Sequence, residues 1–363
     1  MRAVFFFLLA LAPRCHASRV LRIGETLFDG LPSGIYLGGA PLNVAVHLAE
    51  QGVEASYVSA VGKDRLGREA VRRLNARGVD TSLLRTLDDH ETGFVEVDID
   101  EQGDASYTFA TPAAWDHVSS KGITAEAAAA DAVVWGSLGS RAATSREAVL
   151  MAANAAKYAV CDINLRPPFV DETVLVSVAS GVDLLKLNDE ELTPLANALH
   201  SVAKAYGTPG DLVVKLTAAA CDATTAADAA AATASGDDDG TVATAIAEAA
   251  AAIGRAARAS TVVVTRGAQG AVLWDSATQE SWSHPGFVPP QVVDSVGAGD
   301  AFLAALLASL LADGGTPAEA LAAGCRCGAF VASRAGATPA HEPDALAALQ
   351  PASGTGESVR IER

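Results

Sequence analysis

Short apolar runs alternate with longer helical segments along this chain, and that alternation limits the folds it can adopt. The runs are rich in β-branched residues, and the segments between them repeat apolar residues at helical spacing. This pattern predicts an α/β protein whose mostly parallel central sheet is flanked by helices on both faces. The predicted strands are 20–23, 55–61, 132–135, 159–163, 183–187 and 261–265, and the predicted helices include 41–51, 67–77, 145–158 and 190–205.

Two segments do not follow the alternation. Residues 93–100 and 105–109 alternate polar and apolar side chains around Glu101-Gln102-Gly103-Asp104, which predicts a β-hairpin. A hairpin inside an α/β chain indicates a small β lid that stands off the main sheet. Residues 211–216 could form a further strand that competes with 261–265 for one sheet position, and we favour 261–265.

Composition separates the possible functions. The length of 363 residues is typical of two domains, and 50% hydrophobic against 19% charged residues allows a large core. The 43 acidic residues outnumber the 26 Lys and Arg residues, which gives a net charge of −17. This balance argues against binding to nucleic acid or to a membrane surface through a basic face. An anionic small molecule is still compatible, because a few local donors can hold it.

The five cysteines do not suggest a metal or disulfide framework. Their number is odd, and their spacing fits neither paired disulfides nor a four-ligand zinc site. Cys325 and Cys327 lie in an alanine-rich segment with helical character, so we interpret them as core residues.

The N-terminus contains an apolar run over residues 4–12, followed by Pro13 and Ala17. Such a run is typical of a signal or targeting peptide of residues 1–18, and it is too short to span a bilayer. The alternative is a start site assigned upstream of a protein without a leader. Location therefore stays open between the cytoplasm and a plastid or other organelle.

A second unusual segment, residues 218–245, consists largely of Ala, Thr, Asp and Gly. Its triplet Asp237-Asp238-Asp239 could suggest a metal, but the spaced oxygen ligands of a calcium loop are missing. We interpret the segment as a solvated surface loop inserted into the domain.

The strongest chemical motif lies near the C-terminus. Gly297-Ala298-Gly299 precedes a helical run over 303–312, so backbone N–H groups and the helix N-terminus can converge on an anion. Asp300 at this point is placed to accept a proton from an attacking hydroxyl. The alternative reading makes Asp300 an N-cap and the glycines a simple turn.

A second glycine motif, Gly38-Gly39-Ala40-Pro41-Leu42-Asn43, also opens a predicted helix. Pro41 suits a first turn, and the glycines let a ligand approach the backbone. Asn43 offers an amide to ligand hydroxyls. Asp29 is expected at the carboxyl edge of the sheet, after the first strand.

Two common nucleotide-binding motifs are missing from the sequence. It contains no Gly-x-x-x-x-Gly-Lys-Ser/Thr, which excludes a P-loop enzyme, and no Gly-x-Gly-x-x-Gly follows the first strand. A dinucleotide-dependent oxidoreductase is therefore disfavoured.

Both glycine motifs resemble the signature regions of the ribokinase-like (PfkB) carbohydrate kinases. The resemblance covers roughly 20–343 apart from the insert, and it includes Asp294-Ser295-Val296 beside the second motif. The matches between the two motifs stand in the family's order: 162–168, 186–192 and 265–270. Ala114-Trp115-Asp116 and the Ala-Pro after Gly39 are most similar to the fructokinase-like branch.

This resemblance implies a ribokinase-like, three-layer fold and roles for individual residues. Asp300 matches the catalytic base, and the turn Gly297, Ala298 and Gly299 matches the anion hole. The positions that match sugar-binding residues are Asp29, Gly38, Gly39 and Asn43, to which Arg166 is added as a residue that could reach the substrate or only secure its loop.

The resemblance also implies ATP, Mg²⁺ and, in many members, K⁺. On the nucleotide side it assigns Lys186, Asn188, Thr265, Gly267 and Gly270, although Lys186 could equally be structural. Asn188 and Glu191 match a motif that organises magnesium through water. The K⁺ site of the family is matched by Asp294, Val296 and Gly336.

The expected organisation is a possible leader at 1–18, a kinase domain over 19–349 and a tail over 350–363. The lid would comprise about 30–38 and 90–115, with a possible homodimer through it. Two departures from the family pattern are Cys325, where relatives carry Asn near the adenine, and Ser295 in place of Thr.

The predicted activity is transfer of the ATP γ-phosphoryl group to a sugar hydroxyl, with fructose as the expected substrate. A relative that acts on ribose, a nucleoside or a keto-deoxy sugar acid is the alternative. A non-catalytic, regulatory kinase-like protein is the other, although such proteins typically lose the Asp or the glycines that this chain retains.

Overall fold

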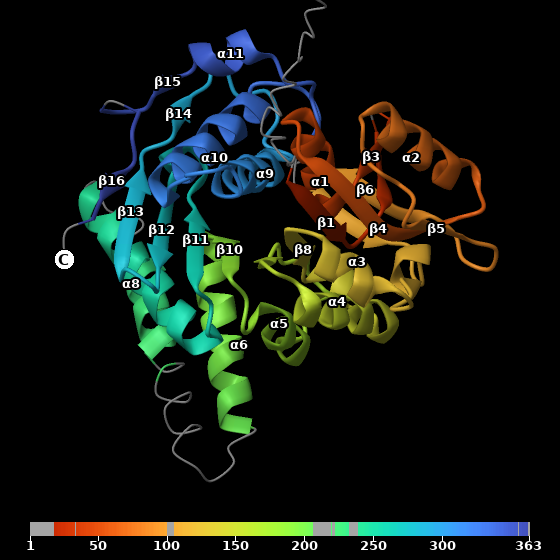
Figure 1. Cartoon of the computed structure of the whole chain (residues 1–363), viewed down its shortest axis with the longest axis horizontal. Coiled ribbons are helices and arrows are strands. Elements are labelled where there is room, and N and C mark those ends of the chain that lie inside the picture. The colour runs from red at the N-terminus through yellow and green to blue at the C-terminus, as the bar shows by residue number, and fades with distance from the viewer. Residues whose placement is uncertain are drawn as a thin grey trace, which may run out of the picture.

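Ten strands form one sheet through the middle of the molecule, in the order β16-β13-β12-β11-β10-β9-β8-β1-β4-β5 (Figure 1). The computed structural model describes residues 18–32, 34–99, 105–205, 219, 222–231, 239–354 and 356–361. Neighbouring strands from β5 to β11 pair in parallel, and β12, β13 and β16 extend one edge in antiparallel pairing. The bounds are β1 Arg19–Ile23, β4 Glu54–Gly62, β5 Leu84–Leu87, β8 Ala132–Gly136, β9 Ala159–Asp162, β10 Leu184–Asn188, β11 Thr261–Thr265, β12 Ala271–Asp275, β13 Glu280–His284 and β16 Val359–Arg360.

Helices cover both faces of this sheet, which confirms the predicted three-layer α/β arrangement. One face carries α1 (Ala40–Glu50), α2 (Arg65–Ala76), α9 (Ala298–Leu310) and α10 (Pro317–Ala332), against which α11 (Pro343–Ala348) packs. The other carries α3 (Ile123–Ala129), α4 (Ala143–Ala155), α5 (Glu172–Ala179), α6 (Leu192–Ala205) and α8 (Asp239–Ala257). Within the described residues there are also four single turns of 3₁₀ helix: η1 Ala114–His117, η2 Leu138–Ser140, η3 Asp189–Glu191 and η4 Gly267–Gln269.

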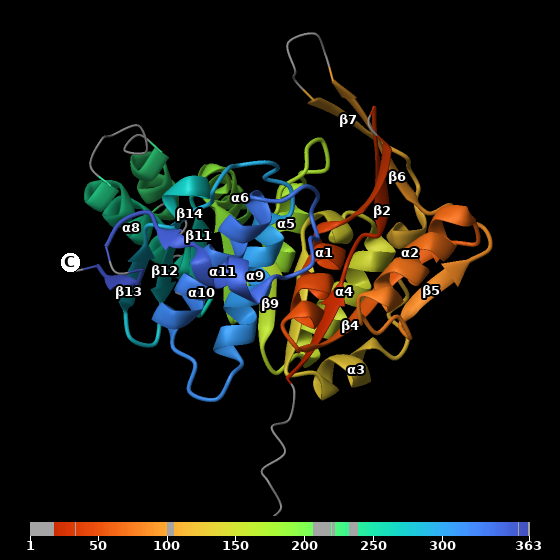
Figure 2. The same cartoon turned by 90° about the horizontal axis from the view of Figure 1, so that it is seen from above.

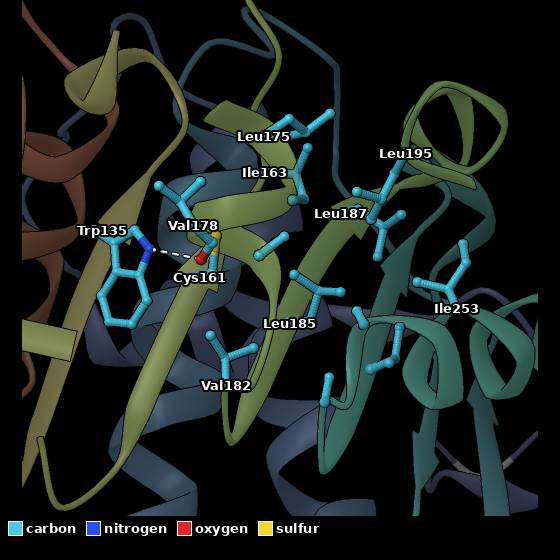
Figure 3. Close-up of a cluster of buried hydrophobic side chains, with 14 of the residues drawn as sticks. Trp135, Cys161, Ile163, Leu175, Val178, Val182, Leu185, Leu187, Leu195 and Ile253 are labelled. Atoms are coloured by element: carbon cyan, nitrogen blue, oxygen red, sulfur yellow. Dashed lines mark hydrogen bonds between the residues drawn. The ribbon is translucent and has the colours of Figure 1, made fainter. Parts of the chain in front are cut away.

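The buried strands alternate their side chains between the two helical layers. Trp135 of β8 and Leu185 of β10 point into the layer of α4 to α8, whereas Val134 and Leu184 point into the opposite layer. Figure 3 shows the first of these cores, in which the indole of Trp135 donates a hydrogen bond of 3.0 Å to the carbonyl of Val178. Apolar burial on both faces is why these strands read as continuous hydrophobic runs.

A separate four-stranded sheet, in the order β3-β2-β6-β7, projects from the body as a lid (Figure 2). It consists of β2 (Leu27–Leu31), β3 (Gly34–Gly38), β6 (Gly93–Ile99) and β7 (Ala105–Phe109). The antiparallel pairing of β6 with β7 confirms the predicted hairpin. Asp29 lies within β2, so its expected place at the edge of the main sheet is wrong, because β1 already ends at Ile23.

The described parts of the alanine-rich insert, 222–231 and 239–245, are helical and not the solvated loop that the composition suggested. Residues 222–231 are helical, and α8 begins at Asp239 inside the predicted loop. Ala223, Ala227 and Ala230 are at most 1% exposed and belong to the core beside α6 and α8. Alanine therefore serves here as a helix former and a core residue.

Two short strands of the C-terminal segment, within residues 350–354 and 356–361, pair with the domain, contrary to the tail that we expected. Within it, β15 (Gln350–Pro351) pairs with β14 (Phe287–Val288), and β16 extends the main sheet. Residues 1–17 of the predicted leader, the competing strand at 211–216 and two residues of the triplet at 237–239 lie outside the described residues.

Two further expectations concern single features. Cys325 and Cys327 are buried in α10 at 6% and 4% exposure, which confirms their interpretation as core residues. Among the helices that the structure describes, none has the length and apolarity needed to cross a membrane.

Candidate active site

The turn before α9 is built around Gly297, which caps the helix. Its φ of 80° lies in the left-handed region, and a methyl group there would collide with the carbonyl oxygen of Ala337. Only glycine suits both conditions. The turn leaves the first backbone N–H groups of α9 without partners inside the helix, next to the positive end of its dipole. This arrangement can hold an anion.

Asp300 lies in the first turn of α9 and is 9% exposed. The Nδ2 of Asn43 donates a hydrogen bond of 2.9 Å to its Oδ2, which joins the two helices that the glycine motifs open. Burial raises the pKa of Asp300 to about 6, and the nearby charge of Asp162 adds to the rise, while Asn43, Lys186 and Arg22 oppose it. A carboxyl with this pKa can accept a proton near neutral pH.

A buried ion pair lies beside this turn. The Nζ of Lys186 is 3.0 Å from the Oδ1 of Asp162, and the two side chains are 8% and 3% exposed. Burial alone would lower the pKa of Lys186, but the carboxylates of Asp162, Glu191 and Asp300 outweigh it and raise the pKa. A Cβ added to Gly299 would lie 3.3 Å from the Nζ, so the ammonium adjoins the anion-binding turn.

Two charged residues of the site escaped the sequence interpretation. Arg22 in β1 is 1% exposed, and Glu25 in the loop after β1 is 3% exposed. Burial lowers the pKa of Arg22 and raises the pKa of Glu25 to about 7. The available signal was an arginine inside the apolar run Val20-Leu21-Arg22-Ile23, since arginine is almost never fully buried without a partner.

A small cavity opens between β1, β8 and β9. Several atoms on its wall lack hydrogen-bond partners among the described residues: the Nη1 of Arg22, the Oε2 of Glu25 and the Oδ2 of Asp162. The Oδ1 of Asn43 is likewise buried without a partner. The other lining residues are Ala40, Pro41, Gly136, Ser137, Leu138 and Asn164. A polar ligand would satisfy such groups, because buried polar atoms are normally hydrogen-bonded.

The predicted sugar-binding residues gather between α1 and the lid. Gly39 caps α1 with a φ of 115°, and a side chain there would collide with the carbonyl oxygen of Glu25. Asp29 is half-buried in β2, and its carboxylate packs against Gly38 on the neighbouring strand. Burial raises the pKa of Asp29, and the positive charge of Arg166 opposes that rise.

Arg166 differs from these residues because it is exposed. Its Nη1 donates a hydrogen bond of 2.9 Å to the carbonyl of Leu165, the residue before it. Its charge nevertheless opposes the rise that burial causes in the pKa of both Asp29 and Glu25, so the guanidinium lies near both carboxyls.

The predicted nucleotide-side residues lie at the carboxyl ends of β10 and β11. Asn188 and Thr265 are register partners in this parallel pair, which places them side by side. Gly267 follows with a φ of 55° and open space around its Cα. Gly270 has a φ of 83° but is packed against the carbonyl oxygen of His284, so its part is to shape the turn.

Glu191 does not present a free carboxylate for a metal. Its Oε1 accepts the N–H of Leu165 at 2.6 Å, and its Oε2 accepts the N–H of Asn188 at 2.9 Å. Within the described ranges, no group of three or more His, Cys, Asp or Glu residues is arranged to hold a metal ion. Asn188 and Glu191 therefore fit an ion that is held mainly through water and phosphate oxygens and that has few direct protein ligands.

The predicted K⁺ residues come from two loops that meet behind α9. The carboxylate of Asp294 accepts the N–H of Val296 at 3.0 Å and the N–H of Gly336 at 3.2 Å. The structure thus brings the three residues together through backbone bonds, and it leaves the second lone pairs of both oxygens for a cation.

Comparison with known proteins identifies the family. The model of the pfkB family of carbohydrate kinases matches residues 33–225 and 210–345. A fructokinase of Salmonella typhimurium is 29% identical over 326 residues, covering 82% of this chain and 86% of that protein. An aminoimidazole riboside kinase of Salmonella typhimurium is 27% identical over 351 residues, covering 91% and 94%.

The fold is shared with solved structures. The fructokinase from Vibrio cholerae O395, in its form with fructose, ADP and calcium ion bound, has a TM-score of 0.66 at 23% identity and covers 92% of this chain and 98% of that one. The family match spans most of the chain and includes both glycine motifs. The protein therefore belongs to the pfkB family of carbohydrate kinases and is an ATP-dependent carbohydrate kinase.

Proposed function

We propose that this kinase phosphorylates fructose to fructose 6-phosphate. The observation that carries the proposal is the hydrogen bond between Asn43 and Asp300, which joins the sugar-side helix to the predicted base. The similarity to fructokinases over 82% of the chain supports this choice of sugar.

In the proposed reaction, Asp300 takes the proton of the sugar hydroxyl as the oxygen attacks the γ-phosphorus. A new P–O bond to the sugar forms while the bond from the γ-phosphorus to the bridging oxygen breaks, and ADP leaves. The N–H of Ala298 donates to the carbonyl of Ser295, so the N–H groups that follow it in the first turn of α9, together with the ammonium of Lys186, would stabilise the charge that develops on the transferred group. The protein's contribution is thus position and electrostatic stabilisation.

The cations of the proposed reaction would come from solution with ATP. Asn188 and Glu191 would hold Mg²⁺ through water, and the ion would supply neutralisation of the phosphate charge. Asp294, with Val296 and Gly336, would hold K⁺ behind the anion-binding turn. Both assignments are supported by the lone pairs that remain on the carboxylate oxygens of Glu191 and Asp294.

The lid would close over the sugar and exclude water from the reacting groups. It also supports a proposal about assembly. Ile35 and Tyr36 on the edge strand β3 are 54% and 44% exposed, and such an edge can pair with a second copy of the same lid. We propose a homodimer through the lid, and a monomeric mass in solution would reject it.

A nucleoside is the second candidate substrate. It is favoured by the similarity to an aminoimidazole riboside kinase over 91% of the chain. The test is a screen of fructose, ribose, nucleosides and keto-deoxy sugar acids with ATP and Mg²⁺, with and without K⁺, with coupled detection of ADP. The Asp300→Asn protein serves as the control for contaminating kinases.

The outcomes of this screen separate the candidates. Turnover of fructose with the highest kcat/KM supports the proposal. Preferred turnover of a nucleoside or a sugar acid replaces the substrate and keeps the mechanism. A protein that binds ATP and turns over none of these compounds would instead fit the regulatory alternative.

A further inference from the structure

Arg22 is a buried cation in the middle of the main sheet. It lies in β1, between β4 and β8, with Tyr57 and Val134 as its register partners. Its neighbours Leu21 and Ile23 point into the apolar core on the other face. Burying a guanidinium costs several kcal/mol on general grounds, so its presence at 1% exposure calls for compensating partners.

Its direct contact is with the helix that carries Asn43. The Nε of Arg22 donates a hydrogen bond of 3.3 Å to the carbonyl of Pro41 in the first turn of α1. Two residues later, Asn43 donates its bond of 2.9 Å to Asp300. A short chain of contacts therefore runs from β1 through the start of α1 to the proposed base.

Its other side faces the cavity. Arg22 lines this cavity together with Glu25 and Asp162, and its Nη1 has no hydrogen-bond partner among the described residues. Asp162 is paired with Lys186, and Asp300 lies near both. Lys186 and Arg22 are the two cations whose charges oppose the raised pKa of Asp300, so removal of Arg22 leaves Lys186 to offset that carboxyl.

We infer that Arg22 is a positioning residue of the phosphoryl-transfer site, which anchors the first turn of α1 through Pro41 and offsets the negative charges of Asp162 and Asp300. The inference rests on the proposed function only in taking Asp300 as the base. Its place in the fold and its contacts are independent of which sugar the enzyme uses.

The electrostatics of the site support this role. Burial and the charge of Asp162 raise the pKa of Asp300, and Arg22 is one of the groups that oppose the rise. Removal of its charge therefore favours the protonated carboxyl and leaves less of the base ionised at a given pH. The polar and charged groups that face this pair are Asp162 on β9, Lys186 on β10, Asn43 on α1, Glu25 after β1 and Tyr57 on β4.

The test measures the ionisation of Asp300 directly. Carboxyl ¹³C signals of aspartate-labelled protein are followed against pH, and the Asp300→Asn protein identifies the signal of residue 300. We expect Arg22→Met to raise the titration midpoint by on the order of half a pH unit, a roughly threefold change in the ionised fraction. Arg22→Gln, which retains a polar side chain, serves instead if Arg22→Met does not fold.

Two further variants separate charge from packing. Arg22→Lys keeps a positive charge, so the midpoint should stay within about 0.2 units of the wild type, while the KM for sugar rises because the contact with Pro41 is lost. Ile23→Val removes a buried methylene from the same strand on the opposite face. It should lower stability and leave the midpoint unchanged.

The kinetic readout follows from the same titration. In the neutral variant, the acidic limb of the kcat/KM profile should move upward together with the NMR midpoint. An unchanged midpoint in both Arg22→Met and Arg22→Gln would overturn the inference, even in a fully active enzyme. A protein that phosphorylates no sugar would reject the proposed function, and the NMR result would still decide the role of Arg22.

Discussion

The two glycine turns of the site are built alike but have different surroundings. Gly39 opens α1 and Gly297 opens α9, each with a positive φ and without a side-chain cap. A methyl group at either position would collide with a backbone carbonyl oxygen, that of Glu25 or that of Ala337. The backbone constraint on the two turns is therefore the same.

What differs is the charge beside each turn. The α9 turn adjoins the ammonium of Lys186 and contains Asp300, whereas the α1 turn presents the amide of Asn43 and the half-buried Asp29. Ionised, buried groups act on charge that develops during a reaction, whereas amides and carboxylates can hydrogen-bond to the hydroxyls of a ligand. From this difference we propose that the α9 turn carries out the chemistry and that the α1 turn positions the substrate.

The largest effect should come from Asp300→Asn. Without a carboxylate to take the proton, we expect kcat to fall by about 10²- to 10⁴-fold, with the KM values for sugar and ATP changed little. Steady-state kinetics with the best sugar of the screen is the measurement. The matched control is Asp313→Asn, an exposed carboxylate in the loop after α9. Near wild-type kcat in Asp300→Asn would remove the base from the mechanism.

The second prediction compares the two turns directly. Gly297→Ala should lower kcat at least tenfold, because the displaced N–H groups no longer meet the transferred group. Gly39→Ala should mainly raise the KM for sugar. Both variants carry backbone strain of about 1–2 kcal/mol as well as a collision. Equal losses of kcat in Gly297→Ala and Gly39→Ala would contradict the separate roles proposed for the two turns.

Gly314→Ala is the control for strain in this pair. Gly314 has a φ of 78° with nothing within 4 Å of an added methyl group, so alanine there is strained without a collision. It should lower the melting temperature and leave kcat and KM at wild-type values.

A third prediction concerns the cost of keeping Asp300 buried. Its pKa is about 6 when folded against an ordinary value of 3.8, so the folded state binds the proton more tightly. Stability therefore falls as the pH rises from about 4 to 6, and the full penalty, on the order of 1–3 kcal/mol, is present above pH 6. Asp300→Asn should melt a few degrees higher than the wild type at pH 7.5 and lose that advantage at pH 4.

Melting curves across this pH range are the measurement for that prediction. Asp313→Asn, which changes an exposed carboxyl on the surface after α9, is measured beside it as the control. A melting temperature of Asp300→Asn below the wild type at every pH would show that the ionised carboxylate is net stabilising, which the burial of Asp300 argues against.

Much of the fold could be read from hydrophobic periodicity, and the exceptions have physical reasons. The strands at 132–135 and 261–265 were predicted to within one residue, because burial on both faces leaves a continuous apolar run. The helix over 222–231 was missed, since an Ala- and Thr-rich segment has the composition of a loop and reveals its packing only when its alanines meet a core. Alanine differs too little in hydrophobicity from its small polar neighbours for the sequence pattern to show which face of the helix is buried.

The glycines of the site could be predicted because a sequence motif fixes the backbone there. The contacts between charged side chains on different strands could not. Gly297 and Gly39 could be found because each needs a conformation that only glycine adopts freely. The pair of Asp162 and Lys186 depends on the register of β9 with β10, and the part played by Arg22 depends on α1 packing over β1. Neither relation is visible in linear sequence.

The smallest expected effect should come from Ser295, and it tests whether the exposed residues before the α9 turn affect the reaction as much as Gly297 does. Ser295 precedes Gly297 by two residues and is exposed, and its carbonyl accepts the N–H of Ala298 at 3.2 Å. Ser295→Thr retains the hydroxyl and the backbone bond, so kcat should stay within about twofold of the wild type, as for surface substitutions in general. Kinetics at saturating ATP and sugar measure it. A loss of kcat as large as that of Gly297→Ala would mean that Ser295 contacts the transferred group. A methyl group added in open solvent would otherwise not change kcat.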